Sequence, residues 1–502
     1  MIDLKRLRAD PDRFKRGARD KGIDVDIELL LKLDEQRRTL LAEQETRRAE
    51  QKKLSKEIGP QIGTLKRQLK DTDGQKRITL QDDIRRLEDR PLALKAEIQA
   101  FERQIAQIEP QWRRLWLEIP QPADPDVPVG DSPAQNVELR RWQPKWFDLE
   151  RSFHDNKGFQ PRTHLELVHD LNLVDFERGV KMAGTRHYVL TGDGMLLHQA
   201  VLRLALDLIT VEHGFTPMTA PVLVHEQCMI GTGFFPAGRD EAYHIEESRR
   251  GAGQDLFLVG TGEVSLMALH ADEILDEAQL PLKYATLSTC FRREAGAAGK
   301  DTAGLFRKHQ FDKVEQVVIC RADETESRQW QETMLGIVET LIQKLELPHR
   351  LVQCCTGDLG TKNADMIDVE CWMPGRGDQG ADGRPVGAWG ETHSASRLYD
   401  YQCRRLNLRY RAADGRTVFC HSLNNTVVAS PRILIPILEL YQNSDGSVTV
   451  PEALRSYMGG RQQIAGGFLA QDIRPGAGLD QERRVRLATE ELPDRTVRSR
   501  TH

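Results

Sequence analysis

The segment FRREAGAAGKDTAGLFRKHQFDKVE, residues 291–315, carries the most unusual chemistry of the chain. Its centre is a loop of small residues that also carries charges, and its two flanks can pair as neighbouring strands. Arg292 suits bidentate contacts with a phosphate, and Phe311 offers a ring on which a base can stack. A charged surface hairpin is the alternative, but seven Gly and Ala residues are costly for a plain hairpin. The segment therefore predicts a site for phosphate and a base.

Two further segments combine glycine or proline with polar side chains. LVGTGE, residues 258–263, is a predicted strand followed by a glycine-flanked hydroxyl and carboxylate. NNTVVASPR, residues 424–432, leads into the predicted helical run ILIPILELY. Each segment by itself is equally typical of a helix cap or a turn.

Residues 94–115 have the most regular hydrophobic pattern in the chain. Apolar side chains recur there at steps of four and three, which indicates a helix with one apolar seam: Leu94, Ile98, Phe101, Ile105, Ile108, Trp112 and Leu115. The same stepping runs through residues 30–58, where the middle is polar. Breakers within residues 59–74, which begin with Gly59-Pro60, separate the two stretches. This predicts an antiparallel two-helix coiled-coil arm with its tip in that zone.

The charge of the chain is unevenly distributed. The whole chain has a net charge of −5, but residues 1–118 hold 28 Lys and Arg against 23 Asp and Glu, and the remainder is acidic. Basic side chains gather toward the predicted tip: Arg47, Arg48, Lys52, Lys53, Lys56, Lys66, Arg67, Lys70, Lys76 and Arg77. Such a cluster suits the phosphates of an extended polyanion. A dimerisation coiled coil or a spacer is the alternative.

The composition excludes several classes of protein. Hydrophobic residues make up 39% of the chain, which excludes wholesale disorder. No run of 18 apolar residues is present, so we expect no membrane association. The first residues lack the apolar segment of a signal peptide, so we expect a cytoplasmic protein. The eight cysteines lie between Cys228 and Cys420 without a CxxC pair, which predicts buried thiols rather than disulfides or a zinc site.

The order of patterns predicts four regions. Residues 1–119 form the arm domain, and residues 120–164 form a proline-rich linker and the entry to the body. Residues 165–459 mix helical and strand patterns, including strands at Val317–Cys320 and Ile367–Trp372 and a helix at Gln199–Val211. The fold class is therefore α+β, with a mainly antiparallel sheet flanked by helices. Residues 460–502 are polar and aperiodic, which is typical of a mobile tail.

Taken together, these segments resemble a known family. Residues 291–315 are similar almost throughout to motif 2 of the bacterial-type seryl-tRNA synthetases, which are class II aminoacyl-tRNA synthetases. MIDLKRLRADPD and LSKEIG resemble the family's tRNA-binding arm, whereas GTRHYVLTGDG and MIGTGFFP resemble its catalytic domain. Residues 214–221 resemble its motif 1. The resemblance covers the chain up to about residue 460 and implies a class II catalytic domain behind the arm.

The resemblance also implies an activity and a set of partners. The family activates L-serine with ATP to seryl-adenylate and then transfers the seryl group to the 3′ end of tRNA-Ser. A homodimer with motif 1 at its interface is implied, and charging of tRNA-Sec is left open. The arm residues implied to contact tRNA are Arg47, Arg48, Lys52, Lys53 and Lys56, and those of the motif 2 loop are Lys300 and Arg307.

Site residues are implied position by position. Arg292 is expected to hold the α-phosphate and the serine carboxylate, Glu294 the adenine edge, and Phe311 the adenine ring. Arg432 would clamp the other face of the adenine and the γ-phosphate. The expected catalytic residues are Arg292, Glu391, Ser394 and Arg432, with Arg293 and Lys308 added at the ATP site and Glu391 and Ser394 binding Mg²⁺. The expected serine-binding residues are Thr261, Gly262, Glu263, Arg292, Glu315, Asn424 and Thr426. Adenylation needs no nucleophilic side chain, so these residues act by positioning and charge neutralisation.

Four positions depart from the family's pattern. His393 and Arg397 stand where Ser and Asn are usual, and Asp365 and Ile367 stand where Lys and Tyr are common. His393 is expected either to pack beside the metal site or to alter metal and ATP affinity through its charge. The departures leave room for a diverged paralogue that binds tRNA or charges an acceptor other than tRNA.

Overall fold

The computed structural model describes residues 1–247, 253–297, 301–380 and 383–466. The chain divides into two compact units. One unit comprises residues 3–18 and 24–119, and the other comprises residues 1–2, 19–23 and 120 onward. We call them the arm unit and the body.

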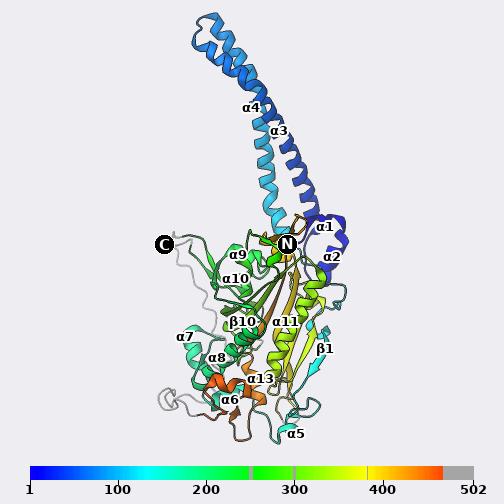
Figure 1. The fold of residues 1–502 in the computed structure, drawn as a ribbon, viewed down its shortest axis with the longest axis vertical. Helices are drawn as coiled ribbons and strands as arrows, with labels where there is room; N and C mark the ends of the chain where they lie inside the picture. The colour runs from blue at the N-terminus through cyan, green and yellow to red at the C-terminus, as the bar shows by residue number, and fades with distance from the viewer. Residues whose placement is uncertain (248–252, 298–300, 381–382, 467–502) are drawn as a thin grey trace, which may run out of the picture. The chain divides into compact units, whose positions relative to one another are not determined.

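Two long helices form most of the arm unit. Short helices α1 (Leu4–Ala9) and α2 (Pro11–Asp20) precede α3 (Ile27–Lys70) and α4 (Gln75–Glu118), which run side by side (Figure 1). The apolar seam is confirmed, because Leu94, Ile98, Trp112 and Leu115 are buried. Ion pairs join the two helices along their length: Arg37–Glu109, Arg47–Glu97, Arg48–Glu102, Arg90–Glu50 and Lys66–Glu88.

The tip of the arm is shorter than the sequence indicates. Helix α3 continues through Gly59, Pro60 and Gly63, and only residues 71–74 form the connection. A proline removes one hydrogen bond from a helix, but pairing along the partner helix continues on both sides of Pro60. The predicted tip at residues 59–74 is therefore wrong in extent, because tertiary pairing outweighs the local breakers.

A single large sheet organises the body. Its strand order is β1-β11-β12-β13-β16-β10-β9-β4, and every neighbouring pair is antiparallel except β4 and β9. The strands are β1 (Val137–Trp142), β4 (Thr216–Met218), β9 (Leu282–Phe291), β10 (Gln310–Cys320), β11 (His349–Gln353), β12 (Asp365–Met373), β13 (Ala388–Tyr399) and β16 (His421–Ser430). The mainly antiparallel sheet and the predicted strands within β10 and β12 are confirmed.

Helices cover the sheet and build the main core with it. Helices α8 (Gly192–Asp207), α11 (Glu324–Lys344) and α13 (Leu434–Leu440) pack against its strands. Alternate residues of β12, among them Ile367 and Val369, enter this core, so the residues between them face the opposite side of the sheet. The side of the sheet away from the core is thus available for polar side chains.

The remaining helices and strands of the body are short. The helices are α5 (Phe153–Lys157), α6 (His164–Asp170), α7 (Phe176–Ala183), α9 (Glu226–Gly231), α10 (Glu263–Ala268), α12 (Tyr401–Arg405) and α14 (Glu452–Arg455). The strands are β2 (Val174–Asp175), β3 (Val189–Leu190), β5 (Leu223–His225), β6 (His244–Ile245), β7 (Leu256–Leu258), β8 (Ile274–Asp276), β14 (Arg409–Arg411), β15 (Thr417–Phe419), β17 (Val448–Thr449) and β18 (Gln463–Ile464).

Three further predictions meet the structure in the body. All eight cysteines are free, and all but Cys228 are buried, as expected. Among the described residues, Gly192–Glu212 alone is long and apolar enough to cross a membrane, but α8 within it contributes buried residues to the core. A core helix passes that test equally well. The interpretation of residues from 460 onward as a tail is wrong for β18, which pairs with β17 and buries Ile464; residues 467–502 lie outside the described residues.

Candidate active site

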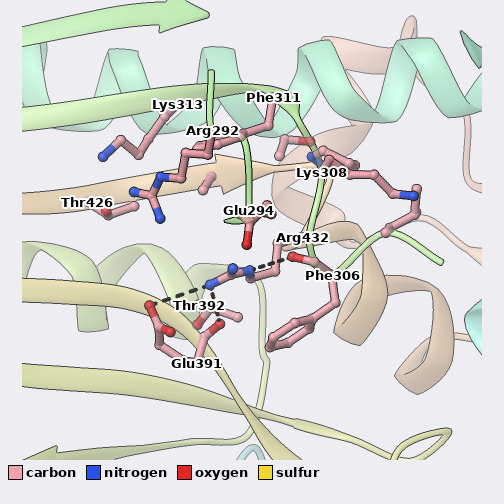
Figure 2. A pocket seen from close by; sticks show the side chains of 14 residues that line it. Arg292, Glu294, Phe306, Lys308, Phe311, Lys313, Glu391, Thr392, Thr426 and Arg432 are labelled. Atoms are coloured by element: carbon pink, nitrogen blue, oxygen red, sulfur yellow. Dashed lines mark hydrogen bonds and ion pairs between the residues drawn. The ribbon is translucent and has the colours of Figure 1, made fainter. Parts of the chain in front are cut away.

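A pocket lies where β9, β10, β13 and β16 come together (Figure 2). Seven of the predicted residues line it: Arg292, Glu294, Lys308, Phe311, Glu391, Thr426 and Arg432. The sequence analysis missed Leu305, Phe306, Lys313, Thr392, Ala429, Ser430 and Pro431, which also line it. Most of these missed residues belong to the segments 291–315 and 424–432. Their closeness in sequence to the predicted residues is the signal that could have found them. The pocket thus joins segments that are far apart in the chain.

Arg432 is held from three sides at the end of β16. Its Nε donates to the Phe306 carbonyl at 3.0 Å, and its Nη1 donates to the Glu391 carbonyl at 3.1 Å. The Glu391 carboxylate lies 3.4 Å from the same Nη1, and the guanidinium lies 4.5 Å from the centre of the Phe306 ring. Burial lowers the pKa of Arg432, although Glu391 opposes the shift. Figure 2 shows Arg432 paired with Glu391 in the pocket. These contacts hold the Arg432 guanidinium in one position, where it can bind an anionic group of a ligand.

Arg292 and Phe311 form the opposite wall. The Arg292 guanidinium carbon lies 5.4 Å from the centre of the Phe311 ring, and its Nε donates to the Gly260 carbonyl at 3.3 Å. A guanidinium beside an aromatic face provides both a phosphate contact and a surface for stacking. Glu294, which has a positive φ of 53°, accepts a hydrogen bond from Arg307 at 3.3 Å. Two opposed arginines and a ring are therefore in place for a nucleotide.

Lys308 is a buried cation of the pocket. It is 5% exposed, and its ammonium lies among aromatic rings, 6.0 Å from the centre of the Tyr188 ring. The same ammonium lies 5.0 Å from the centre of the Phe176 ring. Burial, together with the charge of Arg186, lowers the pKa of Lys308 to about 7. An incoming phosphate would supply a counter-charge.

A second buried cluster adjoins the pocket and contains the expected serine-binding residues. Glu263 is 2% exposed, and both of its carboxylate oxygens accept hydrogen bonds from Lys362, at 2.6 and 2.7 Å. Gln402 and Asn424 donate to the same carboxylate, each at 2.7 Å. The Glu263 carboxylate therefore has its hydrogen bonds filled by protein donors, and its bond with Asn424 holds the Asn424 side chain in one orientation. The sequence analysis assigned no role to Lys362 and Gln402, although both lie in segments that resemble the family's pattern.

Lys313 connects the two clusters. Its ammonium donates to the Thr261 hydroxyl at 2.8 Å and pairs with the Glu315 carboxylate. Burial raises the pKa of Glu315, and Lys313 only partly offsets this. Position 262, next to Thr261, requires glycine, because a Cβ there would lie 2.4 Å from the Thr286 methyl carbon. The cluster offers a hydroxyl and a carboxylate, which can recognise a small polar amino acid.

Oxygen donors gather at the predicted metal site on β13. Ser394 lies directly opposite Asp368 of β12. Burial and the nearby Glu391 charge raise the pKa of Asp368, whose Oδ1 is buried without a hydrogen-bond partner among the described residues. This orphaned oxygen, the Glu391 carboxylate and the Ser394 hydroxyl are hard ligands that fit Mg²⁺. Asp368 also belongs to a group with Cys354 and Asp358 whose ligand atoms lie within 4.8 Å of one another.

The departures from the family's pattern have structural explanations. His393 is 1% exposed, and burial, followed by the charge of His349, lowers its pKa to about 3. It is uncharged near neutral pH, so the expectation that its charge alters the metal site is wrong. Asp365 and Arg397 lie opposite each other on β12 and β13 and form a buried ion pair at 2.9 Å. These two departures compensate each other, and Ile367 enters the core.

The residues expected to contact tRNA differ in their surroundings. Arg47 and Arg48 are engaged in ion pairs with arm glutamates, whereas Lys52, Lys53 and Lys56 are exposed. Arg307 pairs with Glu294 and Asp301, and Lys300 lies outside the described residues. Arg293 is exposed, and its backbone N–H donates to Glu241.

Comparisons with known proteins agree with this geometry. Residues 243–441 match the model of the tRNA synthetase class II core domain (G, H, P, S and T), so fold and pocket define a class II aminoacyl-tRNA synthetase. Residues 1–121 match the seryl-tRNA synthetase N-terminal domain. The chain belongs to the seryl-tRNA synthetase family.

Relatives match nearly the whole chain. A serine–tRNA ligase of Deinococcus radiodurans is 39% identical over 92% of this chain and 99% of its own length. One of Thermomicrobium roseum is also 39% identical, over 92% of this chain and 95% of its own length. The crystal structure of seryl-tRNA synthetase from Pyrococcus horikoshii complexed with ATP is 35% identical, with a TM-score of 0.73 over 93% of this chain and 100% of that chain.

Proposed function

We propose that this chain is a serine–tRNA ligase, which activates L-serine with ATP and transfers the seryl group to the 3′ end of tRNA-Ser. One observation carries the proposal. A nucleotide-sized arrangement of Arg292, Phe311 and Arg432 directly adjoins a buried cluster of Thr261 and Glu315, which suits a small hydroxyl amino acid. With serine and ATP in the two neighbouring clusters, a carboxylate and an α-phosphate would both come within reach of one cation, Arg292.

The residues act on the reaction by position and charge. In adenylation an oxygen of the serine carboxylate attacks the α-phosphorus, and pyrophosphate leaves. Both reacting groups are anionic, so cations are needed to lower their repulsion. Arg292 would hold the carboxylate and the α-phosphate together, Lys308 would meet another phosphate, and Arg432 would bind the γ-phosphate. Phe311 would stack on the adenine, and Glu294 would contact its edge.

Serine would be selected by hydrogen bonds in the buried cluster. Glu315, Thr261 and Thr426 would supply the partners for the hydroxyl and the ammonium of serine; Glu315 and Thr426 lie opposite each other on β10 and β16. Alanine or glycine would leave these buried polar groups unpaired, which is costly. Threonine would bring an additional methyl group into a tightly packed space beside Gly262.

The metal and the macromolecular partners belong to the same proposal. Glu391 and Ser394, with Asp368 beside them, would hold a Mg²⁺ ion, which supplies neutralisation of phosphate charge when bound. The exposed lysines of α3 would contact the phosphates of tRNA-Ser. We further infer a cytoplasmic homodimer. The diverged paralogue is not favoured, because Arg292, Glu315 and Arg432 are all present in the arrangement described.

The test is amino acid-dependent exchange of pyrophosphate into ATP by the full chain. We expect exchange with serine, and rates at least about a hundredfold lower with alanine or threonine, because buried partners are left unpaired or crowded. Arg292→Ala should abolish the exchange. Arg416→Ala, at an exposed arginine paired with Asp414, is the matched control and should leave it unchanged. Absence of any serine-dependent exchange in the unaltered protein would overturn the proposal.

A further inference from the structure

A row of polar side chains crosses three strands on the core side of the pocket. Asp312 of β10 lies directly opposite Thr289 of β9 and directly opposite Ser430 of β16. The Thr289 hydroxyl donates to Asp312 Oδ1 at 2.6 Å. His198, from the middle of α8, lies over the row, with Nε2 3.0 Å from Asp312 Oδ2 and Nδ1 2.7 Å from Ser430 Oγ. One helix and three strands are thereby tied at a single point.

The hydrogen-bond network shows which ring nitrogen of His198 donates to Asp312. Burial opposes ionisation of Asp312, but hydrogen bonds from His198 and Thr289 outweigh it and hold the pKa of Asp312 below its usual value. A carboxylate only accepts, so Nε2 of His198 carries a hydrogen and donates it. Nδ1, the other ring nitrogen, makes the hydrogen bond with the Ser430 hydroxyl. Each polar atom of this row is satisfied, which makes the arrangement rigid.

The combination of Ser, His and Asp does not form a nucleophile here. Ser430 has no exposed surface and His198 is 4% exposed, so neither side chain presents a free nucleophile to the pocket. In a catalytic triad the serine contacts Nε2 of the histidine and the aspartate contacts Nδ1. Here the two are exchanged, with Ser430 at Nδ1 and Asp312 at Nε2. The effect of these side chains is therefore to hold neighbouring residues in place and not to react with a substrate.

Two of the three members on strands lie next to pocket residues, and the third lies on the strand that leads to Arg292. Asp312 stands between Phe311 and Lys313, whose side chains line the pocket from the opposite face of β10. Ser430 immediately precedes Pro431 and Arg432. Thr289 lies three residues before Arg292. A shift of Asp312, Ser430 or Thr289 would therefore move Phe311, Arg432 or Arg292, the side chains expected to contact the nucleotide.

The row lies on one side of an irregularity in the sheet. The pairing of β10 with β16 shifts register between Val314 and Glu315. Asp312 and Ser430 stand on the side of Phe311 and Arg432, whereas Glu315 and Thr426 stand on the other side. A displacement of the row therefore acts most directly on the residues on its own side of this register shift, which include Phe311 and Arg432.

We propose that His198 is a positioning residue of the ATP site, which sets Phe311 and Arg432 through its bonds to Asp312 and Ser430. The inference rests on the proposed function, because it assigns ATP to this pocket. His198 acts first on the nucleotide half of the site, because Phe311 and Arg432 stand on its side of the register shift, whereas Glu315 and Thr426 stand beyond it. The expected signature is a change in the KM for ATP without a change in the KM for serine.

The experiment compares two buried serine–histidine hydrogen bonds in the same body. Ser430→Ala removes the bond to His198. The matched control, Ser327→Ala, removes the bond from Ser327 of α11 to His421 Nδ1, which is 2.8 Å long and equally buried. In serine-dependent pyrophosphate exchange we expect Ser430→Ala to raise the KM for ATP about tenfold and that for serine less than about twofold. Ser327→Ala should change neither KM and should lower only the Tm.

A double-mutant cycle supplies the second measurement. If His198 acts through Ser430, His198→Gln combined with Ser430→Ala should raise the KM for ATP no further than His198→Gln alone. Equal effects of Ser430→Ala on both KM values, or none on the KM for ATP, would overturn the inference. Because the unaltered enzyme is assayed alongside, failure of the proposed function would appear separately, as no exchange in any sample. If His198→Gln does not fold, the comparison of Ser430→Ala with Ser327→Ala still decides.

Discussion

Lys308 shows how a single residue combines binding and pH dependence. Its ammonium is buried beside Phe176, and its pKa of about 7 lies far below that of an exposed lysine. A phosphate binds the protonated form and stabilises it, so binding raises this pKa. Affinity for ATP should therefore be greatest below pH 7 and should fall as the pH rises above 7, because the free enzyme then loses the proton.

The pH dependence of ATP binding tests this account. The KM for ATP in the exchange assay should rise between pH 7 and 8.5, by up to about tenfold per pH unit. Lys308→Arg keeps the charge over this range, because a guanidinium does not lose its proton, and should abolish the Lys308-dependent part of the rise. Identical pH profiles of Lys308→Arg and the unaltered enzyme would contradict the assignment.

At the scale of the element, the pairing of β12 with β13 explains two unusual residues together. Arg397 pairs with Asp365 across the strands and with Asp124, which precedes the sheet, and all three are largely buried. A buried charge without a partner is costly, so Asp365 depends on the arginine, whereas Asp124 also pairs with Arg328. The two departures from the family's pattern are therefore one structural change and not two.

Removing Arg397 should destabilise the body strongly. Arg397→Gln should lower the free energy of unfolding by roughly 3–5 kcal/mol, because it leaves the buried Asp365 carboxylate without a cation, although Asp124 keeps Arg328. Urea unfolding followed by intrinsic fluorescence measures the change. Adding Asp365→Asn to Arg397→Gln should restore part of the loss, and Arg416→Gln at an exposed pair should cost less than about 1 kcal/mol. A small loss for Arg397→Gln would show that the pair is not required.

At the scale of the whole molecule, charge separates two tasks. The arm unit has basic side chains along α3, whereas the body is acidic yet concentrates arginines in its pocket. Contacts with phosphates gain affinity from the release of counterions, so they weaken with salt. Adenylation should be largely independent of the arm, because its expected residues all belong to the body.

Binding of tRNA should depend on three exposed lysines. Replacing Lys52, Lys53 and Lys56 with Gln should raise the Kd for tRNA-Ser and reduce the slope of log Kd against log salt by about two to three. Serine-dependent pyrophosphate exchange should not change. The matched control replaces Lys95, Arg103 and Arg113, which are exposed on α4, and should alter the slope less. Equal slopes for the unaltered protein and the lysine variant would refute the assignment.

The sequence by itself determined the heptad seam of the arm, the mainly antiparallel α+β class, and seven of the pocket residues, because repeats and dense local motifs report on nearby structure. Only the tertiary structure decided that α3 continues through Pro60, that β18 joins the body, and that Lys362 and Gln402 hold Glu263. It also decided that His198, Asp312 and Ser430 meet. These contacts join residues that are far apart in the chain. The energy of a buried charge or hydrogen bond depends on which groups the fold brings together, and no local pattern contains that information.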